Sequence, residues 1–204
     1  MPENTKSVFL KLSKTDLVTQ FTFAGGSALS VYLNHRESED IDLFNCQKRI
    51  DHAFIMETIK DNFEFFSIEY SSKNQIDLNI AGVKLTFFAG SWDTMKDRVH
   101  LVDNMHMASM EMLTAMKLNT LFLRAKFRDY YDLYVINKQI YSIKKMYDIV
   151  KSYMPEINKK LFQMAIIYID DIEDDSILHL HPKYPVTIQE IQTHFENKVI
   201  DWLG

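Results

Sequence analysis

Residues that handle phosphate and metal ions lie close together near the start of this sequence. Gly25, Gly26 and Ser27 follow a short apolar segment, and after twelve further residues come Asp40 and Asp42. A glycine turn that opens a helix presents free backbone N–H groups, and these groups and the helix dipole attract phosphate. The Ser27 hydroxyl adds a further donor. Taken alone, the three residues are more typical of an ordinary turn.

The two aspartates give this pattern its specificity. Side chains two residues apart on a strand project from the same face, so Asp40 and Asp42 form a pair. Two such carboxylates repel each other unless a cation lies between them, and Mg²⁺ favours oxygen ligands. Alone, the pair also fits a solvated strand edge. Beside a phosphate site, it predicts the arrangement that nucleotidyl transfer requires.

The elements expected around these residues form a small α/β half followed by a helical half. Alternating and apolar segments predict strands over residues 21–24, 41–44, 65–70, 75–80 and 83–88. Helical periodicity and caps predict helices over residues 27–34, 49–62, 110–124, 128–138, 143–153, 157–169 and 188–202. We expect residues 1–100 to form the catalytic core. Residues 101–204 would complete the active site and supply a surface for the acceptor.

The amino-acid composition indicates the class of protein and the cellular compartment to expect. Hydrophobic residues make up 47% and charged residues 25% of the sequence, a balance typical of a globular protein. The sequence shows no apolar stretch of about 20 residues, so we expect no membrane span. The single cysteine, Cys46, fits a reducing cytoplasm. The net charge of −5 argues against a protein that coats nucleic acid, although a local basic surface remains compatible with it.

Four segments together resemble the nucleotidyltransferase superfamily, and in particular the AbiEii/AbiGii-type toxin family. They are residues 25–33, residues 35–44 with Asp40-Ile41-Asp42-Leu43, residues 115–118, and residues 124–133 with Arg128-Asp129-Tyr130-Tyr131. The order and spacing match over roughly residues 20–136. Each segment alone is common, and their combination is specific.

The resemblance implies an α+β fold with a small mixed sheet, dependence on Mg²⁺ or Mn²⁺, and a nucleoside triphosphate as substrate. Members of the family are toxins of toxin–antitoxin or phage-defence systems, and some add nucleotides to tRNA ends. A tRNA or other RNA acceptor and a cognate antitoxin protein are therefore expected partners. The resemblance assigns the triphosphate to Gly25, Gly26 and Ser27, and the metal to Asp40 and Asp42.

The family resemblance also implies that Lys117 contacts phosphate and that Asp129 has a catalytic or orienting role. Lys117 lies in an apolar helical stretch, where an unpaired ammonium is costly to bury; the alternative is a lysine that reaches solvent. Arg36 either binds triphosphate, neutralises the aspartate pair, or pairs within the protein. Asp132 fits an internal ion pair. Arg124, Lys126 and Arg128 fit either an RNA contact or a solvated helix end.

The sequence departs from the superfamily where a neighbouring strand usually supplies a third carboxylate. Thr86 occupies that position, and a hydroxyl is not an activated base. A two-residue turn at Ala81-Gly82 would place Asp77 opposite Thr86 on the same face, where Asp77 offers a replacement.

We therefore expect an enzyme that moves a nucleoside monophosphate from a triphosphate to an acceptor hydroxyl. Two alternatives stay open: a nucleotide-binding module without catalysis, and an enzyme that modifies a small molecule such as an aminoglycoside antibiotic.

Overall fold

The computed structural model describes residues 1–90, 92–170, 172 and 177–203. The chain forms two compact units. The first contains Met1–Tyr32 and Glu37–Ser109, and the second contains Leu33–Arg36 and Met110–Gly204. The functional division predicted from the sequence, at residues 100 and 101, stays a prediction.

The first unit is built on a mixed sheet with the strand order β3-β4-β5-β2-β1-β7-β6. Its strands are β1 Thr22–Ala24, β2 Ile41–Asn45, β3 Ser67–Ser72, β4 Gln75–Ile80, β5 Val83–Ala89, β6 Arg98–Val102 and β7 Met105–Ala108. β2 pairs with β5 and β1 with β7 in parallel, while the other neighbours are antiparallel. The predicted α+β fold with a mixed sheet is thus confirmed. β6 and β7 were not predicted.

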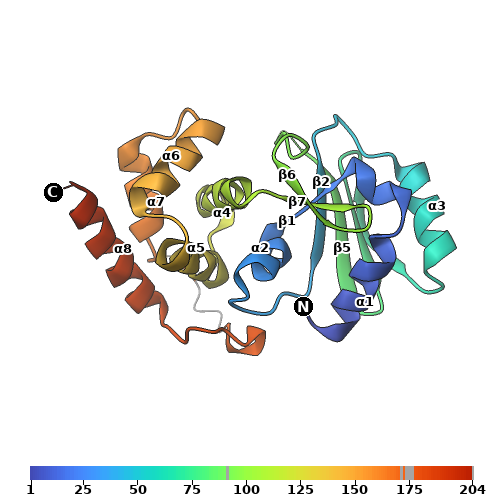
Figure 1. Cartoon of the computed structure of the whole chain (residues 1–204), viewed down its shortest axis with the longest axis horizontal. Coiled ribbons are helices and arrows are strands. Elements are labelled where there is room, and N and C mark those ends of the chain that lie inside the picture. Colours follow the sequence, from blue (N-terminus) through green and yellow to red (C-terminus); the bar gives the residue numbers. More distant parts are fainter. Residues whose placement is uncertain (91, 171, 173–176, 204) are drawn as a thin grey trace. The chain divides into compact units, whose positions relative to one another are not determined.

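Helices cover both faces of this sheet. They are α1 Glu3–Leu12, the 3₁₀ helix η1 Asp16–Gln20, α2 Gly25–Leu33 and α3 His52–Asn62. Figure 1 shows α1 and α3 on one face and α2 on the other. α2 begins two residues earlier than predicted, so Gly25 and Gly26 belong to its first turn. α3 begins later than predicted because the Asp51 side chain caps it, accepting a hydrogen bond from Phe54 N at 3.1 Å.

Alternation along β2 and β5 separates a core face from a polar face. Leu43 and Phe87 pair across the two strands and are fully buried. Their neighbours Asp42 and Thr86 also pair, and they point to the opposite face because successive side chains of a strand alternate. These two strands therefore contribute Leu43 and Phe87 to the core on one face and place Asp42 and Thr86 on the other.

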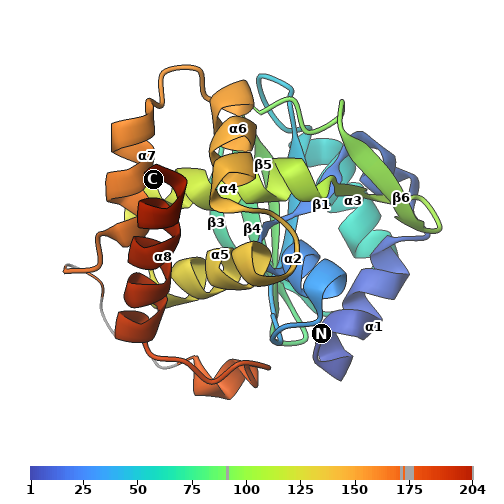
Figure 2. The same ribbon diagram turned by 60° about the vertical axis from the view of Figure 1, so that its left-hand side comes forward.

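The second unit is helical, as predicted (Figure 2). Its elements are α4 Met110–Arg124, α5 Phe127–Gln139, α6 Ile143–Tyr153, α7 Lys159–Ile167, the 3₁₀ helix η2 Leu178–Leu180 and α8 Ile188–Leu203. α4 and α6 have the predicted bounds. α7 is shorter than predicted because the Asn158 side chain caps it through Leu161 N at 2.9 Å. Among the described residues, no helix combines the length and the apolar character that spanning a membrane requires.

Phe87 tests the core of the first unit. Phe87→Ala should lower the free energy of unfolding by about 3–5 kcal/mol, because it removes a fully buried ring. The measurement is urea denaturation. Ile68→Ala on the edge strand β3 is the control, because Ile68 is 52% exposed and should change stability little. Equal losses for the two variants would contradict the assigned core.

Candidate functional site

Gly25 holds the start of α2 against the carboxylate of Asp42. Ala24 pairs with Asp42 across β1 and β2, so the next residue turns directly over that side chain. A Cβ atom at Gly25 would lie 2.4 Å from Asp42 Oδ2, closer than any real side chain could come. The φ angle of Gly25 is +74°, a conformation that glycine adopts at little cost. Glycine is required here on both grounds.

Ser27 fastens the same turn to the other aspartate. Its side chain is buried, and its Oγ lies 2.8 Å from Ser38 Oγ and within hydrogen-bond contact of the Asp40 carbonyl oxygen. These contacts tie the first turn of α2 to the chain that enters β2. The structure thus gives Ser27 partners inside the protein. Its contact with a triphosphate, like those of Gly25 and Gly26, stays a prediction.

A row of side chains crosses three strands at Asp42. Asp42 pairs with Thr86 across the parallel strands β2 and β5, and Thr86 pairs with Asp77 across the antiparallel strands β5 and β4. Ile80 pairs with Val83 around the turn, so the predicted hairpin register is confirmed. Asp77 therefore shares a face with Asp42 and Thr86.

Asp77 is engaged by neighbours on this face. Its Oδ1 accepts a hydrogen bond from Gln75 Nε2 at 2.7 Å, and its Oδ2 lies 3.0 Å from Lys84 Nζ. Among the described residues, no three His, Cys, Asp or Glu side chains gather closely enough to hold a metal ion. Asp77 thus does not join Asp40 and Asp42 as a third ligand in this arrangement.

Electrostatics couple the two ends of the row. Burial alone would raise the pKa of Asp77, but hydrogen bonds from Gln75 and Lys84 hold it below its usual value. The pKa of Lys84 is raised, chiefly by its hydrogen bond to Asp77. Burial opposes this shift, while the charges of Asp77, Asp40 and Asp42 add to it. All three carboxylates are therefore close enough to Lys84 to stabilise its positive charge.

Asp40 and Asp42 fit a divalent cation. Both are partly exposed, whereas Ile41 between them is fully buried. Mg²⁺ prefers carboxylate oxygens and is commonly held by one or two carboxylates, with water and substrate phosphate completing its coordination. The start of α2 lies beside Asp42, and helix starts in general suit phosphate groups because their first backbone N–H groups have no intrahelical partner. The donor set and its surroundings thus suit a magnesium ion bound together with a nucleotide.

The second unit contains a buried cluster of charges around Asp132, whose side chain is fully buried. Arg36 donates from Nε to Oδ1 at 2.7 Å and from Nη2 to Oδ2 at 2.9 Å. Lys117 Nζ lies 2.9 Å from Oδ2, and His35 Nε2 lies 2.7 Å from Oδ1. The predicted internal ion pair of Asp132 is present. Arg36 is one of its partners, so Arg36 pairs within the protein.

Lys117 also pairs with Asp129. Its Nζ donates to Asp129 Oδ1 at 2.8 Å, and the Lys117 side chain is only 8% exposed. The lysine is therefore buried between two carboxylates and does not reach solvent. Asp129 Oδ2 accepts a hydrogen bond from Lys126 N at 3.1 Å and so caps the start of α5. The predicted phosphate contact of Lys117 and the catalytic role of Asp129 stay predictions.

The cluster holds its charges despite burial. Burial would raise the pKa of Asp132, but the charges of Arg36 and Lys117, with hydrogen bonds from Arg36 and His35, hold it well below its usual value. Burial would lower the pKa of Lys117, but Asp132 and Asp129 raise it. Each charge is thus kept in its ionised form by its partners.

His35 is a member that sequence reasoning did not assign to this cluster. A carboxylate only accepts, so Nε2 donates to Asp132. Among the described residues Nδ1 has no partner. The ring stacks on Tyr131 with centroids 5.7 Å apart, and the Tyr131 hydroxyl donates to the His35 carbonyl at 3.1 Å. The adjacency of His35 to Arg36 was the only signal in the sequence.

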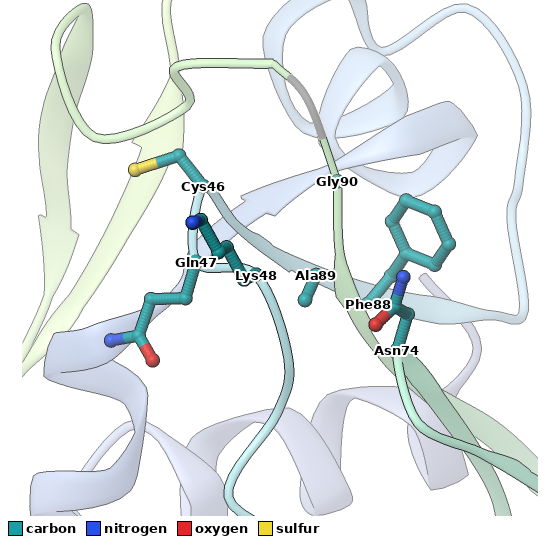
Figure 3. Close-up of a pocket in the computed structure, with 7 residues that line it drawn as sticks. All are labelled: Cys46, Gln47, Lys48, Asn74, Phe88, Ala89 and Gly90. Carbon is teal, nitrogen blue, oxygen red and sulfur yellow. The ribbon is translucent and has the colours of Figure 1, made fainter.

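A separate hollow of about 440 Å³ lies at the far end of β2 and β5 from the aspartates. Figure 3 shows residues 46–48 on one side of it and Phe88 with Asn74 on the other. A Cβ atom at Gly90 would lie 2.6 Å from the Phe88 ring, so this glycine gives the ring its space. None of the predicted site residues lines this hollow.

Comparison with protein families gives a match over most of this chain. The model described as "Nucleotidyl transferase AbiEii toxin, Type IV TA system" matches residues 8–101 and 93–201. An uncharacterized protein of Aquifex aeolicus is 23% identical over 195 residues, which cover 95% of this chain and 93% of that protein.

Solved structures with a similar fold include two bacterial proteins. JHP933 of Helicobacter pylori superposes with a TM-score of 0.54 at 18% identity, over 98% of this chain and 95% of that one. The nucleotidyltransferase toxin MenT4 of Mycobacterium tuberculosis superposes with a TM-score of 0.57 at 13% identity, over 98% and 84%. At these identities the structures support the fold.

Gly25→Ala tests the contact with Asp42. It should reduce both stability and Mn²⁺ affinity, because the new methyl group displaces the carboxylate. The measurements are urea denaturation and Mn²⁺ titration. Gly82→Ala is the matched control, since Gly82 also has a positive φ, +82°, but has open space around its Cβ position. If both variants kept the same Mn²⁺ affinity, the contact would not position Asp42.

Asp132→Asn tests the buried cluster. The free energy of unfolding should fall by about 3–5 kcal/mol, because Arg36 and Lys117 would lose their buried counter-charge. Urea denaturation provides the measurement. Asp148→Asn removes the half-exposed partner of Lys144 and should cost less than about 0.5 kcal/mol. A loss in Asp132→Asn as small as in this control would contradict the assigned role.

The same cluster predicts a pH dependence. Because the folded pKa of Asp132 is lowered, its stabilisation is complete above the unfolded pKa of about 4 and is lost as pH falls through the folded value. Stability measured from pH 6 to pH 2 should therefore fall more steeply in the unmodified protein than in Asp132→Asn. Parallel curves would show that Asp132 does not titrate as described.

Proposed function

We propose that this chain, which belongs to the AbiEii family of nucleotidyltransferase toxins, transfers a nucleoside monophosphate from a triphosphate to an RNA hydroxyl. The family itself establishes the enzyme class predicted from the sequence, a nucleotidyltransferase. Beyond the enzyme class, we propose the metal ion, the triphosphate substrate and the RNA acceptor.

One observation carries this proposal, namely the packing of Gly25 against the Asp42 carboxylate. It brings the start of α2, which suits a triphosphate, directly beside a residue that suits a metal ion. Ser27 holds Asp40 to the same turn through its carbonyl oxygen. A triphosphate on the helix start would thus present its phosphates to the two carboxylates.

The proposed reaction is the transfer of the α-phosphoryl group with its nucleoside. The acceptor hydroxyl releases its proton to solvent as its oxygen bonds to the α-phosphorus. The bond to the bridging oxygen breaks, and pyrophosphate leaves with that electron pair. A divalent ion held by Asp40 and Asp42 would neutralise charge on the phosphates. The backbone N–H groups of Gly25 and Gly26 would orient the triphosphate.

Lys117 and Asp129 are the candidates from the second unit. An ammonium group has three donors, and Lys117 directs two of them to Asp129 and Asp132. The third suits a phosphate oxygen. Asp129 would orient Lys117 through their 2.8 Å hydrogen bond, and Arg36 would bind phosphate only at the expense of its pairing with Asp132.

The proposed acceptor is an RNA such as tRNA. Arg124 and Lys126 are exposed and Arg128 is partly exposed at the junction of α4 and α5, and such a basic run suits a phosphate backbone. The type IV toxin–antitoxin description of the family supports a cognate antitoxin as a further partner. We infer a cytoplasmic location from the lone Cys46, which fits a reducing compartment.

Thr86 favours one other function, a nucleotide-binding module without catalysis. It pairs with Asp42 at the position where a carboxylate would complete the site. Such a module would bind triphosphate and metal without releasing pyrophosphate.

A transfer assay separates these functions. The protein is incubated with each α-labelled triphosphate, Mg²⁺ and total tRNA, and label is measured on RNA. We expect label with at least one triphosphate, and a loss of about 100-fold or more in Asp42→Ala, which removes electrostatic stabilisation of the transition state. Asp148→Ala, on an exposed helical surface of the second unit, is the control and should retain activity.

Nucleotide binding without label would instead support the binding module. Label on a small molecule such as an aminoglycoside, with none on RNA, would replace the RNA acceptor while leaving the chemistry in place.

A further inference from the structure

Lys84 lies on the same sheet face as the candidate metal ligands. It precedes Thr86 by two residues on β5, so the two side chains project to the same side. Ile41 pairs with Leu85, and therefore Asp40 is level with Lys84 across the parallel strands. Lys84 is flanked on the other side by Asn79 of β4. The polar face thus has two adjacent rows, one at Lys84 and one at Thr86.

The Lys84 ammonium takes part in both rows. Its Nζ lies 3.0 Å from Asp77 Oδ2 in the Thr86 row, and its side chain is 45% exposed while that of Asp77 is 8% exposed. Asp40 and Asp42 also interact with it electrostatically. One lysine therefore balances part of the charge of three carboxylates.

A second divalent ion would have to bind in this same place. Paired catalytic metals lie about 3.5–4 Å apart and need several oxygen ligands between them. Here the middle of the row is the neutral hydroxyl of Thr86, and the carboxylate beyond it, Asp77, is already paired with an ammonium. Three carboxylates and one ammonium leave two negative charges, which a single divalent ion balances.

We propose that Lys84, held by Asp77, is a resident cation that takes the place of a second metal ion, so that this site binds one divalent ion. The proposal rests on the proposed function, because it assumes that Asp40 and Asp42 hold the first ion. Lys84 is a positioning residue in this arrangement. It sets the number of ions and keeps Asp77 from coordinating one.

Counting bound Mn²⁺ tests this proposal without any activity measurement. The full chain is titrated with Mn²⁺ alone, and the free ion is followed by its electron paramagnetic resonance signal. The unmodified protein should saturate at one ion per chain. Lys84→Met should bind a second ion at least about tenfold more tightly than the unmodified protein does, because a like charge is removed and Asp77 is released.

Two further variants make the result specific. In the double variant Asp77→Asn with Lys84→Met the second ion should be lost again, because the carboxylate that binds it is gone. Lys73→Met, in the exposed turn between β3 and β4, should still bind one ion. Two ions in the unmodified protein, or one ion in Lys84→Met, would overturn the proposal.

Failure of the proposed function would be seen separately. Asp42→Asn should remove the first ion, and full binding of Mn²⁺ by that variant would reject the metal site itself. The count in Lys84→Met is meaningful only if Asp42→Asn loses its ion, so the two failures give different results.

Discussion

The contact between Gly25 and the Asp42 carboxylate is the constraint on which the candidate site depends. It leaves no room for a side chain, since a Cβ atom would lie 2.4 Å from Oδ2. Strand pairing of Ala24 with Asp42 produces the approach, and Ser27 reinforces it from the same turn of α2 by bonding to the Asp40 carbonyl. A helix start and two carboxylates are thereby kept adjacent. This adjacency is what a metal–triphosphate complex requires.

The second unit buries several charged side chains together. Asp132 has no exposure, and it is stabilised by a two-point hydrogen bond from Arg36 together with Lys117 and His35. A buried ion network of this kind contributes little net stability, but removing one member leaves an uncompensated charge. The arrangement therefore favours one specific set of contacts. His35 and Arg36 belong to this unit although they lie between Ser27 and Asp40 in sequence.

Local patterns in the sequence predicted much of the fold and the register of one hairpin. The bounds of α4 and α6 followed from periodicity and caps, and Ala81-Gly82 correctly placed Asp77 opposite Thr86. The hairpin of β6 and β7 was missed. One of its anchors, the parallel pair of Met107 with Phe23 on β1, joins residues that are distant in sequence.

The family and enzyme class were also correct from short motifs. The partners of Lys117 and the role of His35 could not be predicted from the sequence, because they depend on tertiary contacts that no local pattern encodes.

The roles of Asp40 and Asp42 remain the central claim. Crystals soaked with Mn²⁺ and a non-hydrolysable triphosphate, measured for anomalous scattering, test it most directly. We predict one manganese peak within coordination distance of both carboxylates. A peak elsewhere, with none at this pair, would contradict the account.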